Sequence, residues 1–268
     1  MTHWLEVCRA AAADIREVLD ELPSRREREP VLATGVGGDE TTAIDEAAER
    51  AVVARLEALH RQGEDFLLVS EELGERAFGE SETRVVVDPI DGSVNAKRGL
   101  RHFCLSIGIA DGPSMADVKF GYLYDFGSGE EWTATRGGGA QLDGKALGDV
   151  RPKDMVEVLV AEGTLSTSVA AKAHELAGFA KRFRIMGSLA LALCQLAAGR
   201  VDAVCSLKPA RAVDVAAAQL VVRECGIPIG FAGGEPWDAA PLDPSPQSLV
   251  VAAPTEELRN RLEEILRM

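Results

Sequence analysis

Several features that mark other classes of protein are absent from this sequence or scarce in it. The five cysteines are odd in number and form no CxxC pair. Most of them lie among apolar residues, which is typical of reduced, buried thiols. The four histidines have no spacing that indicates a zinc site or a catalytic triad. The sequence therefore favours neither a disulfide-stapled protein nor zinc or triad chemistry.

Positive charge is also scarce. The chain has 29 Lys and Arg against 43 Asp and Glu, a formal net charge of −14. This balance argues against nucleic acid as a partner, because phosphate backbones are bound by basic patches. A protein of this charge that binds a small anion must neutralise it locally, with metal ions or with a few placed Lys and Arg.

Long apolar runs are absent as well. No run reaches the length of a membrane span, and residues 1–30 are too acidic and polar for a signal peptide. We therefore expect no membrane partner and a cytoplasmic location. The 268 residues, 46% apolar and 27% charged, are typical of a globular protein with one large domain or two modest ones.

Hydrophobic periodicity predicts the order of helices and strands. In the first half we expect helices over 4–22 and 42–60, buried strands over 66–70 and 84–88, and an antiparallel meander over 104–110, 118–125 and 130–136. In the second half we expect strands over 156–163, 182–188, 201–207 and 248–253, and helices over 188–198, 213–225 and 255–268. Segments 24–40 and 137–147 are expected as loops. The order predicts a layered α+β or α/β fold, with a boundary near residues 148–153.

The densest chemical signal is the segment VVVDPIDGS at 85–93. Asp88 and Asp91 follow a buried strand, and Pro89 stiffens the turn between them. Two carboxylates this close repel unless a cation lies between them, and hard oxygen ligands suit Mg²⁺ or Mn²⁺. Gly92 allows close backbone approach, and Ser93 offers a hydroxyl and an N–H for a phosphate. Taken by itself, the motif is more typical of a plain turn after a strand.

Other acids lie at the ends of predicted elements. Glu71 and Glu72 follow the strand at 66–70, and they are informative only if the sheet brings that end beside Asp88. Thr42 and Asp45 have the spacing of a capping box at the start of a predicted helix. Asp45 and Asp214 each lie in the first turn of a predicted helix, where an acid suits the helix dipole without any further function. Each of these acids is, alone, more often structural.

The order of these segments resembles the inositol monophosphatase family, within the superfamily that includes fructose-1,6-bisphosphatases and bisphosphate nucleotidases. It is most similar to the archaeal type described as inositol monophosphatase/fructose-1,6-bisphosphatase. The stretches that carry the resemblance, from about residue 37 to 226, are GGDET…D, VSEELG, VVDPIDGSVNAKRG, RIMGS, GRVDAV and KPARAVDVAAA. The resemblance implies an αβαβα sandwich of the sugar-phosphatase type and a homodimer. Residues 1–150 would carry most metal ligands, and 151–268 would carry Asp214 and the substrate contacts.

The resemblance also implies roles for the acids. Glu71, Asp88 and the backbone carbonyl of Ile90 would bind one Mg²⁺, and Asp88, Asp91 and Asp214 would bind a second. Mn²⁺ could substitute for Mg²⁺.

The remaining implied roles concern water and phosphate. Gly92 and Ser93 would seat the phosphate, and the Ser93 hydroxyl with Asp45 would activate the attacking water. Asp39 and Glu40 would lie in a mobile loop that helps a third metal.

Substrate contacts are expected from two segments that precede the implied ligands. Arg184, Gly187 and Ser188 form one, and Lys208 and Arg211 form the other, although solvated loop charges are the alternative. Leu189 and Val213 depart from the family's usual residues, which leaves the substrate open.

The function implied is a phosphomonoesterase for inositol-1-phosphate and fructose-1,6-bisphosphate. The alternatives are a 3′(2′),5′-bisphosphate nucleotidase, an NADP phosphatase, or a regulatory binding protein of the same fold. With 5% aromatic residues, we expect no aromatic shelf for an adenine ring near the substrate segments.

Overall fold

The computed structural model describes residues 2–35, 40–148, 155–163, 165–233 and 236–267. Its first half contains α1 (Thr2–Glu21), α2 (Arg25–Arg28), β1 (Val31–Thr34), β2 (Glu40–Thr42), α3 (Ala43–His60), β3 (Phe66–Ser70), β4 (Gly74–Phe78), β5 (Arg84–Asp91), α4 (Ser93–Arg98), β6 (Cys104–Ala110), β7 (Val118–Asp125), β8 (Glu131–Thr135), β9 (Gly139–Leu142) and β10 (Lys145–Ala146). Its second half contains β11 (Val156–Glu162), α5 (Ser166–Ala177), β12 (Ala180–Arg184), α6 (Leu189–Ala197), β13 (Ala203–Ser206), α7 (Ala212–Glu224), β14 (Ile229–Ala232), β15 (Leu249–Ala252) and α8 (Glu256–Arg267).

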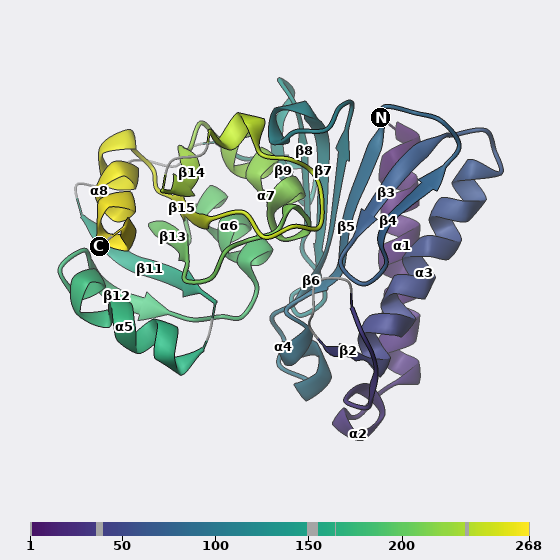
Figure 1. Cartoon of the computed structure of the whole chain (residues 1–268), viewed down its shortest axis with the longest axis horizontal. Helices are drawn as coiled ribbons and strands as arrows, with labels where there is room; N and C mark the ends of the chain where they lie inside the picture. The colour runs from purple at the N-terminus through teal and green to yellow at the C-terminus, as the bar shows by residue number, and fades with distance from the viewer. Residues whose placement is uncertain (1, 36–39, 149–154, 164, 234–235, 268) are drawn as a thin grey trace.

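Helices and sheets alternate in layers (Figure 1). Besides a two-stranded sheet of β1 and β2, the described residues form an eight-stranded sheet, called the first sheet below, and a five-stranded one, called the second. Helices α1 and α3 cover the outer face of the first sheet, α6 and α7 lie between the first and second sheets, and α5 and α8 cover the far face of the second. This αβαβα order confirms the predicted fold class.

The first sheet has the strand order β10-β9-β8-β7-β6-β5-β3-β4. Strands β6, β7 and β8 are antiparallel neighbours, which confirms the predicted meander. Strands β3 and β5 run parallel, with Ser70 opposite Val87. Parallel strands end at the same edge of a sheet, so the residues after β3 and those at the end of β5 come together.

The outer helices bury apolar stripes against this sheet. Trp4 and Ile15 of α1, Ile44 and Val52 of α3, and Phe66 of β3 belong to one hydrophobic cluster. Helix α3 begins after Thr42 because the Thr42 backbone N–H donates to a carboxylate oxygen in the first helical turn. This is the capping geometry that the sequence predicted.

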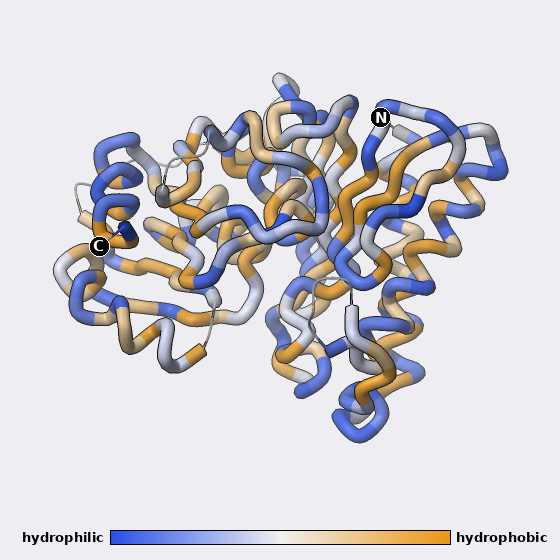
Figure 2. The backbone as a smooth tube through the Cα atoms, viewed as in Figure 1, coloured by the Kyte–Doolittle hydropathy of each residue, from blue (hydrophilic) through white to orange (hydrophobic). Residues whose placement is uncertain are grey.

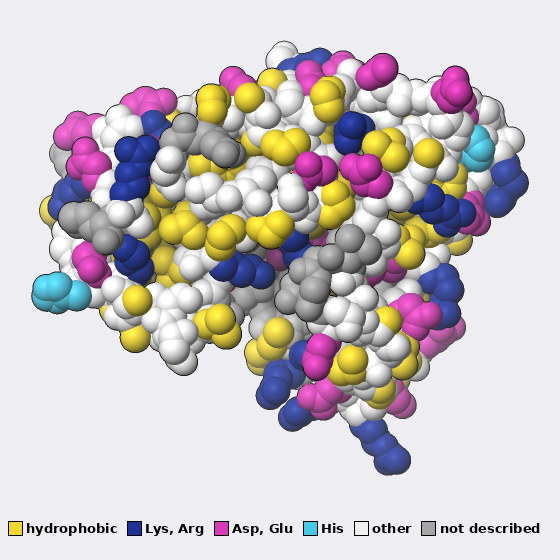
Figure 3. Space-filling model, in the orientation of Figure 1, with side chains coloured by type: hydrophobic (Ala, Val, Ile, Leu, Met, Phe, Trp, Pro, Cys, Tyr) yellow, Lys and Arg dark blue, Asp and Glu magenta, His cyan; other side chains and the backbone are white. Residues whose placement is uncertain are grey.

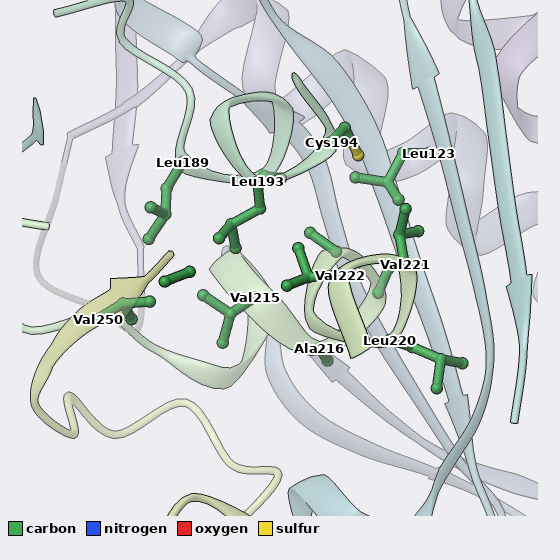
Figure 4. Packing of buried hydrophobic residues seen from close by; sticks show 14 of the residues in the cluster. Leu123, Leu189, Leu193, Cys194, Val215, Ala216, Leu220, Val221, Val222 and Val250 are labelled. Carbon is green, nitrogen blue, oxygen red and sulfur yellow. The ribbon is translucent and has the colours of Figure 1, made fainter. Parts of the chain in front are cut away.

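The middle layer requires close contact between helix and sheet. Gly108 and Gly121 lie opposite each other on β6 and β7, and a Cβ placed on Gly121 would lie 2.6 Å from the carbonyl oxygen of Ala217 in α7. The backbone of α7 therefore lies directly on the strands. Within the same layer α6 packs against α7, and Figure 4 shows Leu193 of α6 near Val222 of α7.

The second sheet has the order β12-β11-β13-β15-β14, and β11 runs parallel to both β12 and β13. Helix α8 covers it with the buried Leu262 and Leu266 and the partly buried Leu258 and Ile265, whereas its remaining residues are hydrophilic and mostly blue in Figure 2. Strand β12 is an edge strand whose residues after Ala180 are exposed.

Some elements differ from the sequence prediction. Segment 24–40 was expected as a loop but contains α2, β1 and the start of β2, and segment 137–147 contains β9 and β10. Strand β1 is exposed along its whole length, so it carries no pattern of burial. Helix α5 was not predicted because Leu176 alone is buried in it. Strands β4 and β14 were also not predicted.

The predicted boundary near residues 148–153 falls almost entirely outside the described residues. A single hydrophobic cluster nevertheless contains Val69 and Val86 from the first half and Val204 and Val250 from the second. All five cysteines lie in the described ranges, and none forms a disulfide. Across those ranges, no helix is both long and apolar enough to cross a membrane.

Candidate active site

A bulge at the end of β5 sets the direction of two carboxylates. The pairing of β5 with β6 shifts register between Asp88 and Asp91. Asp88 is 2% exposed, and the backbone N–H of Ile90 donates to its Oδ1 at 2.9 Å. The turn therefore holds Asp88 in a fixed orientation at the edge of the sheet.

The parallel pairing of β3 and β5 brings the next acid to this point. Glu71 follows β3 directly, and its carboxyl group lies within hydrogen-bonding distance of Asp88. The condition set by the sequence, that the sheet must bring this strand end beside Asp88, is met by the structure.

Asp91 is held by the start of α6. The Ser188 hydroxyl donates to Asp91 Oδ2 at 2.5 Å, and the Ala190 backbone N–H donates to the same oxygen at 2.8 Å. Ser188 is also the N-cap of α6, where its oxygen accepts from the Leu191 N–H. The second half of the chain thus orients a carboxylate that belongs to the first.

Asp214 lies in the first turn of α7, as predicted. Its Oδ2 accepts from the Arg211 backbone N–H at 2.7 Å. The Arg211 guanidinium donates to Asp214 Oδ1 at 3.2 Å and to Glu71 Oε1 at 2.5 Å. Arg211 was expected to contact substrate, and the structure places it inside the acidic cluster.

The electrostatics follow from burial. Burial raises the pKa of Asp88 well above its usual value, and the neighbouring carboxylates of Glu71, Asp91 and Asp214 raise it further. Burial also raises the pKa of Asp91 to about 7, against hydrogen bonds from Ser188 and Ala190 that lower it. Burial raises the pKa of Glu71, while Arg211 lowers it. The four acids therefore repel one another in this arrangement.

This donor set suits a hard divalent cation. Four carboxylates converge, and carboxylate oxygens are the ligands that Mg²⁺ and Mn²⁺ prefer. Burial and the neighbouring carboxylates raise the pKa of Asp88 and Asp91, and a bound cation would relieve this repulsion. Within the part of the chain that the structure describes, no group of three or more Asp, Glu, His or Cys side chains is arranged so that it could hold a metal ion as it stands. Some of their oxygens are bonded to Arg211 and to the start of α6.

The Gly92–Ser93 turn lies directly after these acids. Gly92 has φ 102°, the left-handed conformation that favours glycine. A Cβ there would lie 3.0 Å from the carbonyl oxygen of Gly187. The structure therefore brings together the predicted phosphate-binding turn and the predicted Gly187–Ser188 segment.

Asp45 is buried, and its Oδ2 accepts from both the backbone N–H and the hydroxyl of Thr42. Burial raises its pKa, against these hydrogen bonds and the charge of Lys97, which lower it. Asp45 also raises the pKa of Glu72, so it lies near the turn that carries Glu71. The capping role is present, and the predicted role with water remains a prediction.

The remaining predicted residues are more peripheral. Arg184 and Lys208 are exposed, and Arg184 donates to the carbonyl oxygen of Phe183. Phe183 is 36% exposed. It lies opposite Leu159 of the cluster under α5 and α8, whereas Arg184 lies opposite Val160 of the middle layer, so the two side chains point to opposite faces of β12. The expectation that no aromatic shelf lies near the substrate segments stays a prediction. Glu40 is exposed in β2, and Asp39 lies outside the described residues.

Two buried glutamates that sequence reasoning missed support the site. Glu162 ends β11 and accepts from the backbone N–H groups of Met186 and Gly187, both at 2.9 Å. Glu49 of α3 accepts from the Ser70 hydroxyl at 2.5 Å and from the backbone N–H of Glu72. Glu49 holds the turn that carries Glu71, and Glu162 holds the turn that carries Ser188. A weak signal existed for Glu49, which lies one helical turn after Asp45.

Asn95 of α4 was also missed. Its Nδ2 donates to the carbonyl oxygens of His102 and Met186, at 2.8 and 2.7 Å. It therefore links the predicted phosphate-binding turn to the predicted substrate segment, where Met186 lies 91 residues further along the chain.

Comparisons with known proteins agree with this site. The model of the inositol monophosphatase family matches residues 1–267. The fructose-1,6-bisphosphatase/inositol-1-monophosphatase of Thermococcus kodakarensis is 30% identical over 266 residues, covering 99% of this chain and 98% of that protein. The Nus factor SuhB of Pasteurella multocida is 32% identical over 237 residues, covering 85% and 84%. A crystal structure of an inositol monophosphatase–fructose 1,6-bisphosphatase matches with a TM-score of 0.84 at 27% identity, covering 98% of this chain and 99% of that one.

The family model covers nearly the whole chain, and the fold, the motif order and the acidic site agree with it. The chain belongs to the inositol monophosphatase family, which is a family of phosphatases.

Proposed function

We propose that this chain is a Mg²⁺-dependent phosphomonoesterase acting on small sugar and polyol phosphates, with inositol-1-phosphate and fructose-1,6-bisphosphate as substrates. One observation supports it most. Four buried or half-buried carboxylates from the end of β3, the end of β5 and the start of α7 converge beside the Gly92–Ser93 turn. A purely structural role gives no reason to collect so many repelling acids.

The acids would hold the cations. Glu71, Asp88 and the Ile90 carbonyl would bind one ion, and Asp88, Asp91 and Asp214 a second; Mn²⁺ would substitute. When bound, such a pair polarises the phosphoryl oxygens and lowers the pKa of a coordinated water. The chain's own contribution is orientation.

Proton handling falls to Ser93 and Asp45. The Ser93 hydroxyl would orient the attacking water, and Asp45 would accept its proton. Burial raises the pKa of Asp45, which makes its carboxylate a better proton acceptor than an exposed one. Asp39 and Glu40 would assist a third cation.

The substrate's remaining groups would meet the second half of the chain. Gly187 packs against the Gly92 turn. A phosphate held at that turn would therefore have the segment from Arg184 to Ser188 beside it. The exposed side chains of Arg184 and Lys208 would neutralise a second phosphate. On the face drawn in Figure 3, Lys and Arg are interspersed with Asp and Glu, so the overall negative charge does not exclude local cationic contacts.

Two alternatives stay in the test. A bisphosphate nucleotidase or NADP phosphatase would share the metal-binding motifs of the proposed phosphatase. Several relatives carry the name Nus factor SuhB, which favours a regulatory binding protein.

The test is phosphate release from inositol-1-phosphate, fructose-1,6-bisphosphate, 3′-phosphoadenosine 5′-phosphate and NADP⁺, with Mg²⁺, with Mn²⁺ and after chelation. We expect both sugar phosphates to be hydrolysed, the nucleotides poorly, and all activity to stop on chelation and return with Mg²⁺. A preference for the adenosine bisphosphate would select the nucleotidase. No hydrolysis of any substrate with Mg²⁺ would favour the binding protein. The family resemblance also suggests a homodimer, which light scattering after size exclusion would test.

A further inference from the structure

Arg211 occupies an unusual position for a cation. It is the N-cap of α7 and 8% exposed as a residue. Its guanidinium joins Glu71 and Asp214, which lie 140 and 3 positions from it in the sequence. By contrast, the side chains of the Arg182–Glu157 pair are 54% and 53% exposed. A buried pair is screened far less than an exposed one, so Arg211 interacts strongly with both acids.

The charges around Arg211 explain why it is there. Glu71, Asp88 and Asp214 form one repelling group, and Arg211 lowers the pKa of both Glu71 and Asp88. Burial acts to lower the pKa of Arg211, yet Asp214 and Glu71 raise it overall. The guanidinium thus remains charged and partly offsets the repulsion between the acids, as a bound metal ion would.

The same contacts conflict with metal binding. Arg211 holds Glu71 Oε1 and Asp214 Oδ1, and both acids are proposed metal ligands. An oxygen that accepts a short charge-assisted hydrogen bond is less available to a cation. A guanidinium and divalent ions gathered in one small, buried site also repel each other.

We propose that Arg211 is the resident counter-ion of the metal-free site, and that divalent cations bind in competition with its ion pair to Glu71. Arg211 is a positioning residue in this role, because it acts through the acids and sets the metal affinity. The inference rests on the proposed Mg²⁺ function. It adds that one residue of this chain, Arg211, sets the affinity of the site for Mg²⁺.

A purely structural role for Arg211 makes a different prediction. If Arg211 only anchored the start of α7, its loss would weaken the metal-free and metal-bound proteins alike and would leave Mg²⁺ binding unchanged or weaker. If it is a counter-ion, its loss harms the metal-free protein most and makes Mg²⁺ bind more tightly.

The experiment compares wild type with Arg211→Gln, Arg211→Lys and Arg182→Gln, the last as a control that removes an exposed ion pair. The thermal midpoint is measured after chelation and at saturating Mg²⁺, and the Mg²⁺ Kd is measured by calorimetry. For Arg211→Gln we expect a metal-free midpoint lower by about 5 °C or more, a larger gain in midpoint from Mg²⁺ than in wild type, and a Kd about tenfold tighter. Arg211→Lys should lie between, because a compact ammonium cannot hold both acids as the planar guanidinium does. Arg182→Gln should match wild type in its response to Mg²⁺.

Each outcome is decisive. Equal losses of midpoint with and without Mg²⁺, or an unchanged or weaker Kd in Arg211→Gln, would overturn the proposal. If Arg211→Gln fails to fold, Arg211→Lys decides by the same two readouts. If wild type binds no Mg²⁺, the proposed metal function fails first and the competition with it. If wild type binds Mg²⁺ but Arg211 variants bind it no better, only the counter-ion role fails.

Discussion

Replacing Gly121 with alanine would place a methyl group between β7 and α7. The new Cβ would lie 2.6 Å from the carbonyl oxygen of Ala217 and 3.2 Å from its carbonyl carbon and Cα. These are backbone atoms of a buried helix, so no flexible side chain can move aside. Gly121 is not among the described glycines with positive φ, so the cost is steric and not conformational.

The magnitude follows from the required movement. Ordinary contact begins near 3.4 Å, so α7 must move by roughly 0.5–1 Å. Overpacking of this kind costs about 1–3 kcal/mol, or roughly 3–10 °C in thermal midpoint for a chain of this size. Ala217 lies one helical turn after Asp214, so the shift should also displace that carboxylate and lower kcat.

The assay is thermal unfolding at saturating Mg²⁺ together with kcat on inositol-1-phosphate. The matched control is Gly178→Ala, because Gly178 ends a helix with φ −83° and a Cβ there would meet its nearest atom at 3.9 Å. An unchanged midpoint and unchanged kcat in Gly121→Ala would refute the argument that α7 lies directly on the strands.

Three further perturbations test the support of the site. Burial raises the pKa of Glu49 to about 7, and its buried Oε1 has no hydrogen-bond partner among the described residues. The folded state therefore binds more protons than the unfolded state between pH 4.5 and 7. Wild type should lose stability as pH rises through that window. The unfolding free energy measured with urea should differ between pH 6 and pH 8 by about 1–3 kcal/mol less in Glu49→Gln than in wild type. An identical difference in the two proteins would contradict this prediction. Asp88→Asn should reduce turnover by orders of magnitude yet raise the chelated protein's thermal midpoint, since it removes a repelling charge; a lowered midpoint would count against the repulsion. Glu162→Ala leaves the N–H groups of Met186 and Gly187 without their acceptor, so KM should rise for both sugar phosphates, and steady-state kinetics with unchanged KM would argue against its positioning role.

Local sequence was a good guide wherever a residue's environment comes from its own neighbours. The helix start at Thr42 and Asp45 was predicted from spacing alone, and the structure shows the same hydrogen bonds. The helix predicted over 188–198 is observed as α6, with Ser188 as its N-cap. Strand β1 and helix α5 were missed because they bury almost nothing, so no hydrophobic period distinguishes them from loops.

In the candidate site, too, the sequence indicated the acids but not the residues that they contact. Taken singly, Glu71, Asp91 and Asp214 each fit an ordinary turn or helix start, and the order of motifs along the chain indicated a common site. The partners of these acids could not be read from that order. Glu71 meets Arg211 from 140 positions away, and Asp91 meets Ser188 from 97 positions away.

The sequence by itself thus determined the family, the layered fold class and the acids that carry the proposed chemistry, because motif order and periodicity are properties of the chain. The tertiary structure alone decided that β3 and β5 run parallel, that glycines at 108 and 121 admit α7 against the sheet, and that Arg211 pairs with the acids instead of facing outward. The physical reason is that packing and ion pairing depend on distance in space. The same residue types at the same spacing would form a plain turn, a helix cap or a solvated charge if the sheets met differently.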